Sequence, residues 1–220
     1  MSRGAENLGG IVLCGGASRR MGLSKADLPF GDETMLQRVV RLLGEVASPV
    51  AVVAAADQSL PPLPDDVLVA RDDKPDRGPL EGLAAGLATL QSRAAVAYAT
   101  SCDAPLLQPA FIEALRERLA PDDDAVVAVD GKFHHPLAAI YRVSVLAEVR
   151  ALLDADQLRP FFLFDRCRTS RVEIDDLRSA DAQLLTLKNV NEPDDYFQAL
   201  RRAGLECPDE IRAQFDRRDH

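Results

Sequence analysis

Several features are missing from this sequence of 220 residues, and each absence excludes a class of protein. Basic residues are not in excess, because 26 Lys and Arg stand against 35 Asp and Glu and the formal net charge is -9. A protein that grips nucleic acid through its phosphates needs a basic face, so we expect no nucleic-acid partner. No apolar run is long enough to span a membrane, and the first residues lack the apolar segment of a signal peptide.

Cysteine is scarce and widely spaced. The cysteines are Cys14, Cys102, Cys167 and Cys207. No two of them form a C-x-x-C pair, so the sequence indicates neither a zinc knuckle nor a redox motif. We therefore expect reduced thiols and a cytoplasmic protein that has no membrane partner.

Two familiar glycine-rich phosphate loops are absent as well. Gly22 is followed by leucine and Lys25 by alanine, which breaks the pattern G-x-x-x-x-G-K-[ST]. The earlier glycines of this segment, Gly15 and Gly16, are adjacent, which breaks G-x-G-x-x-G. These two absences exclude kinase-like ATPases and dinucleotide dehydrogenases.

Apolar runs and helical stretches alternate from residue 11 to about residue 120. Short buried strands are predicted to begin at residues 11, 49, 66 and 94. Stretches with helical spacing lie between or after them at residues 34–46, 79–92 and 108–120. This alternation predicts an α/β protein with a mostly parallel sheet, helices on both faces and right-handed connections.

The second half of the sequence is less regular. Residues 124–142 are predicted to form two strands joined by a loop at Asp130 and Gly131, and residues 143–155 a helix. Residues 186–204 predict a strand, a turn and a helix with Pro193 in its first turn. We find no linker, so residues 9–204 are predicted to be one domain. A charged tail follows at residues 205–220, with the composition of a mobile segment.

A basic, glycine-rich cluster follows the first strand. Ligands of an open parallel sheet bind outside the carboxyl ends of its strands. In residues 15–25, glycines allow close backbone approach, and Arg20 and Lys25 offer a fork and a point charge for phosphate. This combination suits the triphosphate of a nucleotide. A surface turn with solvated basic residues is the competing interpretation, and the two cations in one loop weigh against it.

Two acidic clusters follow other strands. Asp103 ends a buried strand and precedes Ala-Pro, so its carboxylate is predicted to point into the crevice as a candidate ligand for Mg²⁺. A helix cap before Pro109 is the competing interpretation. Asp72 and Asp73 could accept hydrogen bonds from ribose or base, or lie in a plain polar loop.

Histidine and asparagine pairs are the remaining candidates. His134 and His135 are predicted in a loop, where adjacent side chains diverge and make a poor metal pair. That loop either contacts substrate or is simply exposed. Asn191 lies at a strand-to-helix turn, where it could be the helix N-cap with Asp194 at its N3 position.

Five ordered motifs resemble those of the nucleotidyltransferases, and most closely the molybdenum cofactor guanylyltransferase family. The residues in register with the signature L-x-G-G-x-S-x-R-M-G-x-x-K are Leu13, Gly15, Gly16, Ser18, Arg20, Met21, Gly22 and Lys25. Later segments are similar to G-P-L-x-G, C-D-x-P-x-L, H-P-L-x-x-x-Y and N-x-N-x-P-x-D. The resemblance spans roughly residues 10–200, nearly the whole domain.

The resemblance implies a three-layer, doubly wound nucleotidyltransferase fold. It implies GTP and Mg²⁺ as partners, molybdopterin as acceptor, and molybdopterin guanine dinucleotide and pyrophosphate as products. It also implies further partners, namely proteins that deliver the cofactor and molybdoenzymes that receive it. Because the acceptor's phosphate monoester is itself a nucleophile, the resemblance fits a sequence without an obvious Ser/His or Cys/His nucleophile.

The resemblance also implies a role for each motif. The nucleotide-binding residues it implies are Leu13, Cys14, Gly15, Gly16, Lys25, Asp72 and Asp103. The catalytic residues it implies are Arg20, Lys25 and Asp103, with Asp103 as the metal ligand. The residues it implies on the acceptor side are His135, Asn189 and Asn191. In this scheme the two cations hold the triphosphate and stabilise charge on the leaving pyrophosphate.

Base selectivity is the least determined property. A polar residue expected near the end of the strand from residue 49 is absent through Ala56, with Asp57 and Gln58 just beyond. Cys14 stands where the family usually has alanine. Cytidylyltransferase relatives typically read A-A-G at this place and lack G-P-L-x-G, which favours guanine here. The alternatives are a CTP-dependent molybdopterin cytidylyltransferase, a sugar-phosphate nucleotidyltransferase and a non-catalytic nucleotide-binding module.

Overall fold

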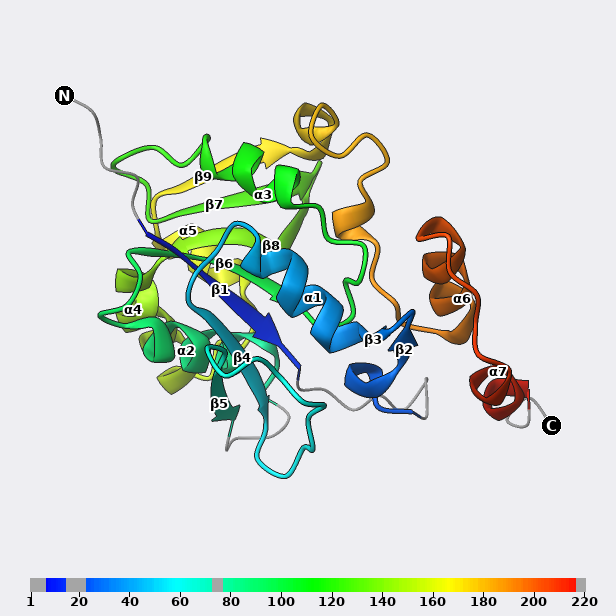
Figure 1. Cartoon of the computed structure of the whole chain (residues 1–220). Coiled ribbons are helices and arrows are strands. Elements are labelled where there is room, and N and C mark those ends of the chain that lie inside the picture. Colours follow the sequence, from blue (N-terminus) through cyan, green and yellow to red (C-terminus); the bar gives the residue numbers. More distant parts are fainter. Residues whose placement is uncertain (1–6, 15–22, 73–76, 217–220) are drawn as a thin grey trace.

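A seven-stranded sheet forms the centre of the computed structural model, which describes residues 7–14, 23–72 and 77–216 (Figure 1). The strand order is β5-β4-β1-β6-β8-β7-β9. The strands are β1 (Leu8–Leu13), β4 (Val50–Ala55), β5 (Leu68–Asp72), β6 (Val96–Ser101), β7 (Ala125–Asp130), β8 (Phe133–Arg142) and β9 (Thr169–Glu173). Neighbouring strands from β5 to β6 are parallel, whereas β8 runs antiparallel to both β6 and β7. The predicted mostly parallel sheet is confirmed.

Helices cover both faces of this sheet. The helices are α1 (Met35–Gly44), α2 (Pro79–Leu90), α3 (Pro109–Arg116), α4 (Leu146–Asp154), α5 (Phe161–Arg166), α6 (Pro193–Arg202) and α7 (Asp209–Asp216). One apolar cluster joins α1 and α3 to one face of the sheet, and a second joins α2, α4 and α5 to the other. The predicted three-layer, doubly wound architecture is therefore confirmed.

Helix α1 shows why these segments fold as they do. Its buried stripe is formed by Leu36, Val39, Val40 and Leu43, the helical spacing seen in the sequence. Its first turn is closed by a capping box in which the Gln37 backbone amide donates to Thr34 Oγ1 at 3.3 Å. In return the Thr34 amide donates to Gln37 Oε1 at 2.8 Å.

Two glycines allow α2 to start and lie where it does. Gly78 has a φ of 76°, which permits the turn into Pro79 at the first helical position. Gly86 faces β1 so closely that an added Cβ would lie 2.6 Å from Ile11 Cγ2. The glycines of this segment therefore fix α2 against the strand that leads into the basic cluster.

The second half of the chain corrects two predictions. Residues 185–187 form a short 3-10 helix, η4 (Leu185–Leu187), instead of the predicted strand. His134 and His135 lie within β8 and not in a loop, next to an irregularity in the pairing of β7 with β8. The predicted turn at Asp130 and Gly131 and the predicted helix at residues 143–155, here α4 with the preceding turn η2 (Val143–Val145), are confirmed.

A third apolar cluster ties the end of the chain to its beginning. The small hairpin of β2 (Pro29–Phe30) and β3 (Glu33–Thr34) packs with α6 and α7, on the right of Figure 1. Tyr196 of α6 donates from its hydroxyl to the Pro29 carbonyl at 2.5 Å. The segment predicted as a charged tail contains α7, whose Phe215 is buried against Tyr196 and Phe197. That this segment is mobile stays a prediction.

The connection between β4 and β5 carries no helix. Residues 56–67, all of them described, contain only turns and irregular backbone, with prolines at positions 61, 62 and 64. The flank of α1 next to this connection is therefore covered by a loop instead of a helix (Figure 1). Within the described part of the chain, no helix combines the length and apolar character needed to cross a membrane.

Candidate active site

An ion pair joins the basic cluster to the acidic cluster at the carboxyl ends of the strands. Lys25 Nζ lies 3.2 Å from Asp103 Oδ2, and both side chains are mostly buried. Lys25 begins the 3-10 helix η1 (Lys25–Asp27), and Asp103 follows β6. Because β1 and β6 are parallel neighbours, the segments leaving their carboxyl ends meet at one edge of the sheet. Asp103 is no helix cap, because the N-cap of α3 is Gln108.

Asn191 completes this cluster from the far end of the sequence. Lys25 Nζ also donates to Asn191 Oδ1 at 3.1 Å, so the ammonium group lies between a carboxylate and an amide oxygen. The backbone amide of Val190 donates to the Asp103 carbonyl at 2.8 Å, which fastens this segment beside β6. Ser101 donates from its hydroxyl to Asp103 Oδ1 and so fixes the other carboxylate oxygen.

The third apolar cluster explains why Lys25 and Asn191 meet. Leu28, three residues after Lys25, and Val190, directly before Asn191, are both buried in this cluster. The two segments are thus packed on the same apolar surface. The competing interpretation of Asn191 as the helix cap is wrong, because Glu192 is the N-cap of α6. Asp195 closes the turn by accepting from the Asn191 and Glu192 amides at 2.9 and 3.0 Å.

Leu13 and Cys14 bring the end of β1 to the same edge. The Leu13 carbonyl accepts from the Cys102 amide at 2.9 Å, and the Cys14 amide donates to the Val53 carbonyl at 2.7 Å. The Cys14 carbonyl accepts from Gln58 Nε2 at 3.1 Å. The backbone at this point is therefore held rigidly by its neighbours on both sides.

The two thiols at these strand ends influence each other. A hydrogen bond from the Cys102 thiol lowers the pKa of Cys14, with a smaller contribution from Gln58, and outweighs the effect of burial. The same hydrogen bond, followed by burial, raises the pKa of Cys102 well above its usual value. Both thiols are free and buried.

Gln58 and Arg71 help to hold the backbone at the ends of β1 and β4, and neither residue was assigned to the site from the sequence. Gln58 follows β4 and reaches both the Cys14 carbonyl and, at 3.4 Å, its sulfur. Arg71 in β5 donates to the carbonyls of Ala55 and Gln58 at 3.0 and 2.6 Å. One signal in the sequence pointed to Gln58, which stands just beyond the place where a polar residue was expected. Its contact with Cys14 depends on the path of a loop, which periodicity does not predict.

The remaining candidates lie farther from Lys25. Asp72 ends the edge strand β5 and pairs with Ala55 of β4, so it lies at the carboxyl edge two strands away from β1. His135 lies near the start of β8, which runs antiparallel to β6 and begins toward the same edge. Burial lowers the pKa of His135, and its Nε2 has no hydrogen-bond partner among the residues described. Asn189 is exposed beside Val190.

His134 is held away from this cluster. Its ring stacks on Phe164 with centroids 5.2 Å apart and meets Phe161 edge-on. Arg171 Nε donates to His134 Nε2 at 3.0 Å. The two histidines therefore have different surroundings, as the sequence predicted for adjacent residues. Gly15, Gly16 and Arg20 lie outside the described residues.

A divalent cation fits Asp103 in one specific way. Among the residues described, no group of three His, Cys, Asp or Glu side chains could hold a metal by itself. Mg²⁺ commonly binds through only one or two carboxylates and completes its shell with water and substrate phosphates. A single carboxylate at the carboxyl edge of the sheet matches that requirement. Asp103 could therefore hold Mg²⁺ together with a phosphate, though not alone.

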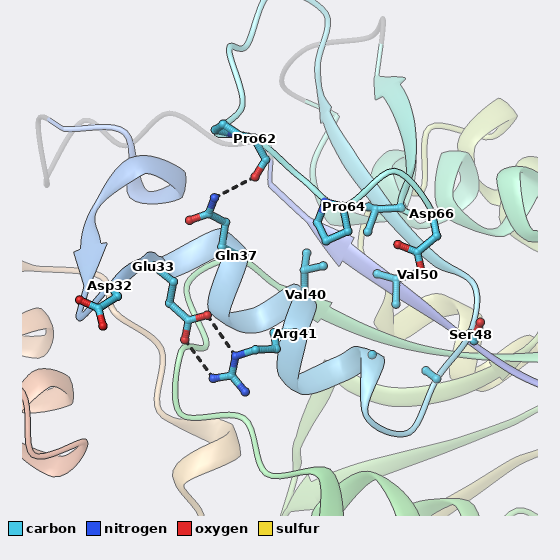
Figure 2. A pocket seen from close by; sticks show the side chains of 13 residues that line it. Asp32, Glu33, Gln37, Val40, Arg41, Ser48, Val50, Pro62, Pro64 and Asp66 are labelled. Atoms are coloured by element: carbon cyan, nitrogen blue, oxygen red, sulfur yellow. Dashed lines mark hydrogen bonds and ion pairs between the residues drawn. The ribbon is translucent and has the colours of Figure 1, made fainter.

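A separate cavity of about 550 Å³ lies between α1 and the β4–β5 connection (Figure 2). Val40, Pro62 and Pro64 give it apolar walls, and Gln37 donates to the Pro62 carbonyl at 2.8 Å. Glu33 at its rim pairs with Arg41 at 2.9 Å. Burial alone would raise the pKa of Glu33, but its hydrogen bonds and its charge interaction with Arg41 lower it. No residue predicted as part of the site lines this cavity.

Comparison with known proteins decides the family. A model of the MobA-like NTP transferase domain matches residues 10–170. The chain belongs to this family. The probable molybdenum cofactor guanylyltransferase of Mycobacterium tuberculosis (strain ATCC 25618 / H37Rv) is 38% identical over 205 residues, which cover 91% of this chain and 92% of that relative. The resemblance inferred from the motifs is thereby confirmed.

Solved structures of lower identity share the MobA-like NTP transferase fold. Molybdopterin-guanine dinucleotide biosynthesis protein A from Archaeoglobus fulgidus superposes with a TM-score of 0.73 at 20% identity, covering 89% of this chain and 98% of that chain. A cytidylyltransferase from Leptospira borgpetersenii superposes with a TM-score of 0.61 at 15% identity, covering 87% and 84%. Since both guanine and cytidine enzymes match, these likenesses support the fold and do not select the base.

Proposed function

We propose that this protein transfers GMP from GTP to the phosphate of molybdopterin, yielding molybdopterin guanine dinucleotide and pyrophosphate. The observation that carries the proposal is Lys25, held by Asp103 and Asn191 from two other motifs of the family. The relatives that are 38% identical over 91% of this chain are named as guanylyltransferases, which supports guanine as the base. We further propose that the reaction occurs in the cytoplasm, with proteins that deliver and receive the cofactor as partners.

Charge neutralisation is the main task of the protein in this reaction. The acceptor phosphate attacks the α-phosphorus of GTP, and the bond to the pyrophosphate group breaks. Lys25 stabilises the negative charge that grows on the leaving group, and Arg20 shares this role by its place in the motif. Asn191 orients the ammonium group by accepting one of its hydrogens at 3.1 Å. A fixed cation needs no reorientation during the reaction, which lowers the barrier.

Asp103 is the proposed Mg²⁺ ligand, and Ser101 fixes its orientation. Bound Mg²⁺ would withdraw charge from the phosphate oxygens and so favour attack at the α-phosphorus. The Ser101 hydroxyl holds one carboxylate oxygen, while the other faces Lys25. No general base is required, because the attacking phosphate is already ionised near neutral pH.

The base and the acceptor are assigned to opposite sides of this cluster. Leu13, Cys14 and the glycines after them are proposed to line guanine and the phosphates, with Asp72 near the base or ribose. His135, Asn189 and Asn191 are proposed to face molybdopterin. The buried Nε2 of His135, which lacks a partner among the described residues, supports a polar ligand on that side.

Nucleotide choice tests the proposal. Purified protein is incubated with molybdopterin and Mg²⁺ and with either GTP or CTP, and pyrophosphate release is measured. We expect turnover with GTP and at most a small rate with CTP. Turnover with CTP alone would identify a cytidylyltransferase, and turnover only with sugar phosphates as acceptors would identify a different transferase. Lys132→Ala, at the exposed turn between β7 and β8, is the control variant.

A further inference from the structure

Cys14 and Cys102 stand side by side at the ends of two neighbouring strands. The parallel register of β1 and β6 pairs Leu13 with Ser101, so the next residues along both strands are these two cysteines. The Cys102 amide donates to the Leu13 carbonyl at 2.9 Å, which continues the ladder to this point. Both cysteines belong to the same apolar cluster and therefore point to the same face of the sheet.

The two side chains lie next to each other. The strand register places Cys102 directly across from Cys14, and both are buried in the same apolar cluster. Neighbouring strands lie about 4.7–4.9 Å apart, and disulfides join residues whose Cα atoms are about 4.4–6.8 Å apart. A disulfide between these residues therefore needs only a small movement. Burial of both side chains shields the pair from other protein thiols.

We propose that Cys14 and Cys102 form a redox-active dithiol, a site of reversible oxidation that stops turnover. The oxidant is a hydroperoxide. Two S–H bonds and the O–O bond break, one S–S bond forms, and the peroxide oxygens leave as water or as water and an alcohol. Each sulfur loses one electron, and the peroxide gains both.

The position of the dithiol explains why oxidation would stop turnover. Cys102 is joined directly to Asp103, and Cys14 directly precedes the glycines of the basic cluster. Forming the bond brings the sulfurs to about 2.05 Å and fixes the torsion angle between them, so the side chains at the ends of β1 and β6 must reorient. We expect Asp103 to shift relative to Lys25, whose ammonium group now lies 3.2 Å away.

The other two cysteines provide internal controls. Cys167 packs against the cluster that contains α4 and α5, whereas Cys207 packs against the cluster that contains α6 and α7. They therefore lie in different apolar clusters, and neither shares the cluster of Cys14 and Cys102. Oxidation specific to the dithiol should link only the peptides that carry Cys14 and Cys102.

Mass spectrometry of the full-length protein tests the disulfide without any substrate. Protein treated with hydrogen peroxide is alkylated, digested without reductant and mapped. We expect a Cys14–Cys102 cross-link that dithiothreitol removes, with Cys167 and Cys207 recovered as alkylated thiols. If peroxide oxidises the protein without forming this cross-link, the proposal is overturned.

An activity measurement tests the consequence, and this part rests on the proposed function. We expect turnover to fall in proportion to the cross-linked fraction and to return with dithiothreitol. Cys102→Ser should keep basal turnover and lose the sensitivity to peroxide, while Cys207→Ser should stay sensitive; Cys102→Ala serves if the serine variant does not fold. Reversible inactivation of both Cys102 variants would overturn the proposal. Absence of GTP-dependent turnover would sink only the proposed function, because the cross-link is measured separately.

Discussion

The cavity beside α1 and the charged cluster around Lys25 differ in what they offer a ligand. The cavity beside α1 has a volume of about 550 Å³ and walls formed in part by apolar side chains, and its Glu33 and Arg41 already pair with each other. The cluster around Lys25 joins side chains that lie up to 166 residues apart in the sequence. The first region offers space, whereas the second offers a positioned cation beside a carboxylate.

The difference between these regions follows from the fold. The cavity exists because the β4–β5 connection is a loop where a helix would otherwise cover α1. The cluster exists because parallel strands end at one edge and because α6 packs back onto the β2–β3 hairpin. In this protein, the candidate active site is identified by charged and polar side chains that meet at one edge of the sheet, and not by the volume of a cavity.

Removing the cation should have the largest effect. Lys25→Ala takes away a preorganised charge, and we expect kcat to fall by about 10²–10³-fold. Pyrophosphate release in steady state measures the loss, and circular dichroism verifies the fold. Lys132→Ala, which removes an exposed lysine, should leave kcat unchanged. Equal activities of the Lys25 and Lys132 variants would remove Lys25 from the mechanism.

Asn191→Ala should lower turnover less, by about tenfold, the value of one hydrogen bond to a charged group. The reason is that the Lys25 ammonium keeps Asp103 but loses its second acceptor. A double-mutant cycle sharpens this test, because the Asn191 substitution should have almost no effect in the Lys25→Ala background. Fully additive effects would show that Asn191 acts independently of Lys25.

Ser101→Ala should lower turnover by about fivefold, since a single hydrogen bond contributes about 1 kcal/mol. The substitution frees one oxygen of Asp103 and loosens the carboxylate. We therefore expect a higher Mg²⁺ concentration at half-maximal rate, measured by titrating the metal at saturating GTP. Ser144→Ala, at an exposed position, is the matched control. An unchanged metal dependence would argue against the positioning role of Ser101.

A substitution in the cavity should have the smallest effect on turnover. Gln37→Ala removes half of the capping box of α1 and the contact with Pro62, so we expect a loss of about 1 kcal/mol in unfolding free energy. For a chain of this size, that loss lowers Tm by about 2–4 °C. Thermal unfolding and pyrophosphate release are measured on the same sample. A large drop in turnover would show that the cavity also takes part in the reaction, contrary to the assignment of the active site to the cluster around Lys25.

The parallel part of the fold could be predicted from the sequence because its signals are local. Apolar runs mark β1, β4 and β6, and helical spacing marks α1 and α3. The placement of the basic and acidic clusters at one edge also followed from the rule that parallel strands end together, whereas the ion pair between Lys25 and Asp103 was not predicted. The hydrogen bond between Lys25 and Asn191 could not be predicted, because it depends on the packing of α6 far along the chain.

The wrong predictions have local causes that patterns do not capture. The strand predicted at residue 186 is a 3-10 helix because Asp181 accepts from the Leu185 and Thr186 amides at 2.9 and 2.8 Å. A side chain that binds the backbone in this way competes with strand pairing. The N-cap of α6 was predicted at Asn191, one residue before its actual position at Glu192. Both residues lie just before Pro193, so the sequence pattern does not separate them.

The contact between Lys25 and Asn191 also determines at what stage of protein synthesis the cluster can be completed. Synthesis releases the N-terminal part first, so β1, β6 and the Lys25–Asp103 pair leave the ribosome well before α6. The cluster gains its last side chain only when the segment 166 residues after Lys25 has emerged and docked. A chain truncated at residue 170, where the family match ends, would lack Asn191 and most of the third apolar cluster. The cluster of Lys25, Asp103 and Asn191 is therefore completed only near the end of synthesis, and an unfinished chain lacks it.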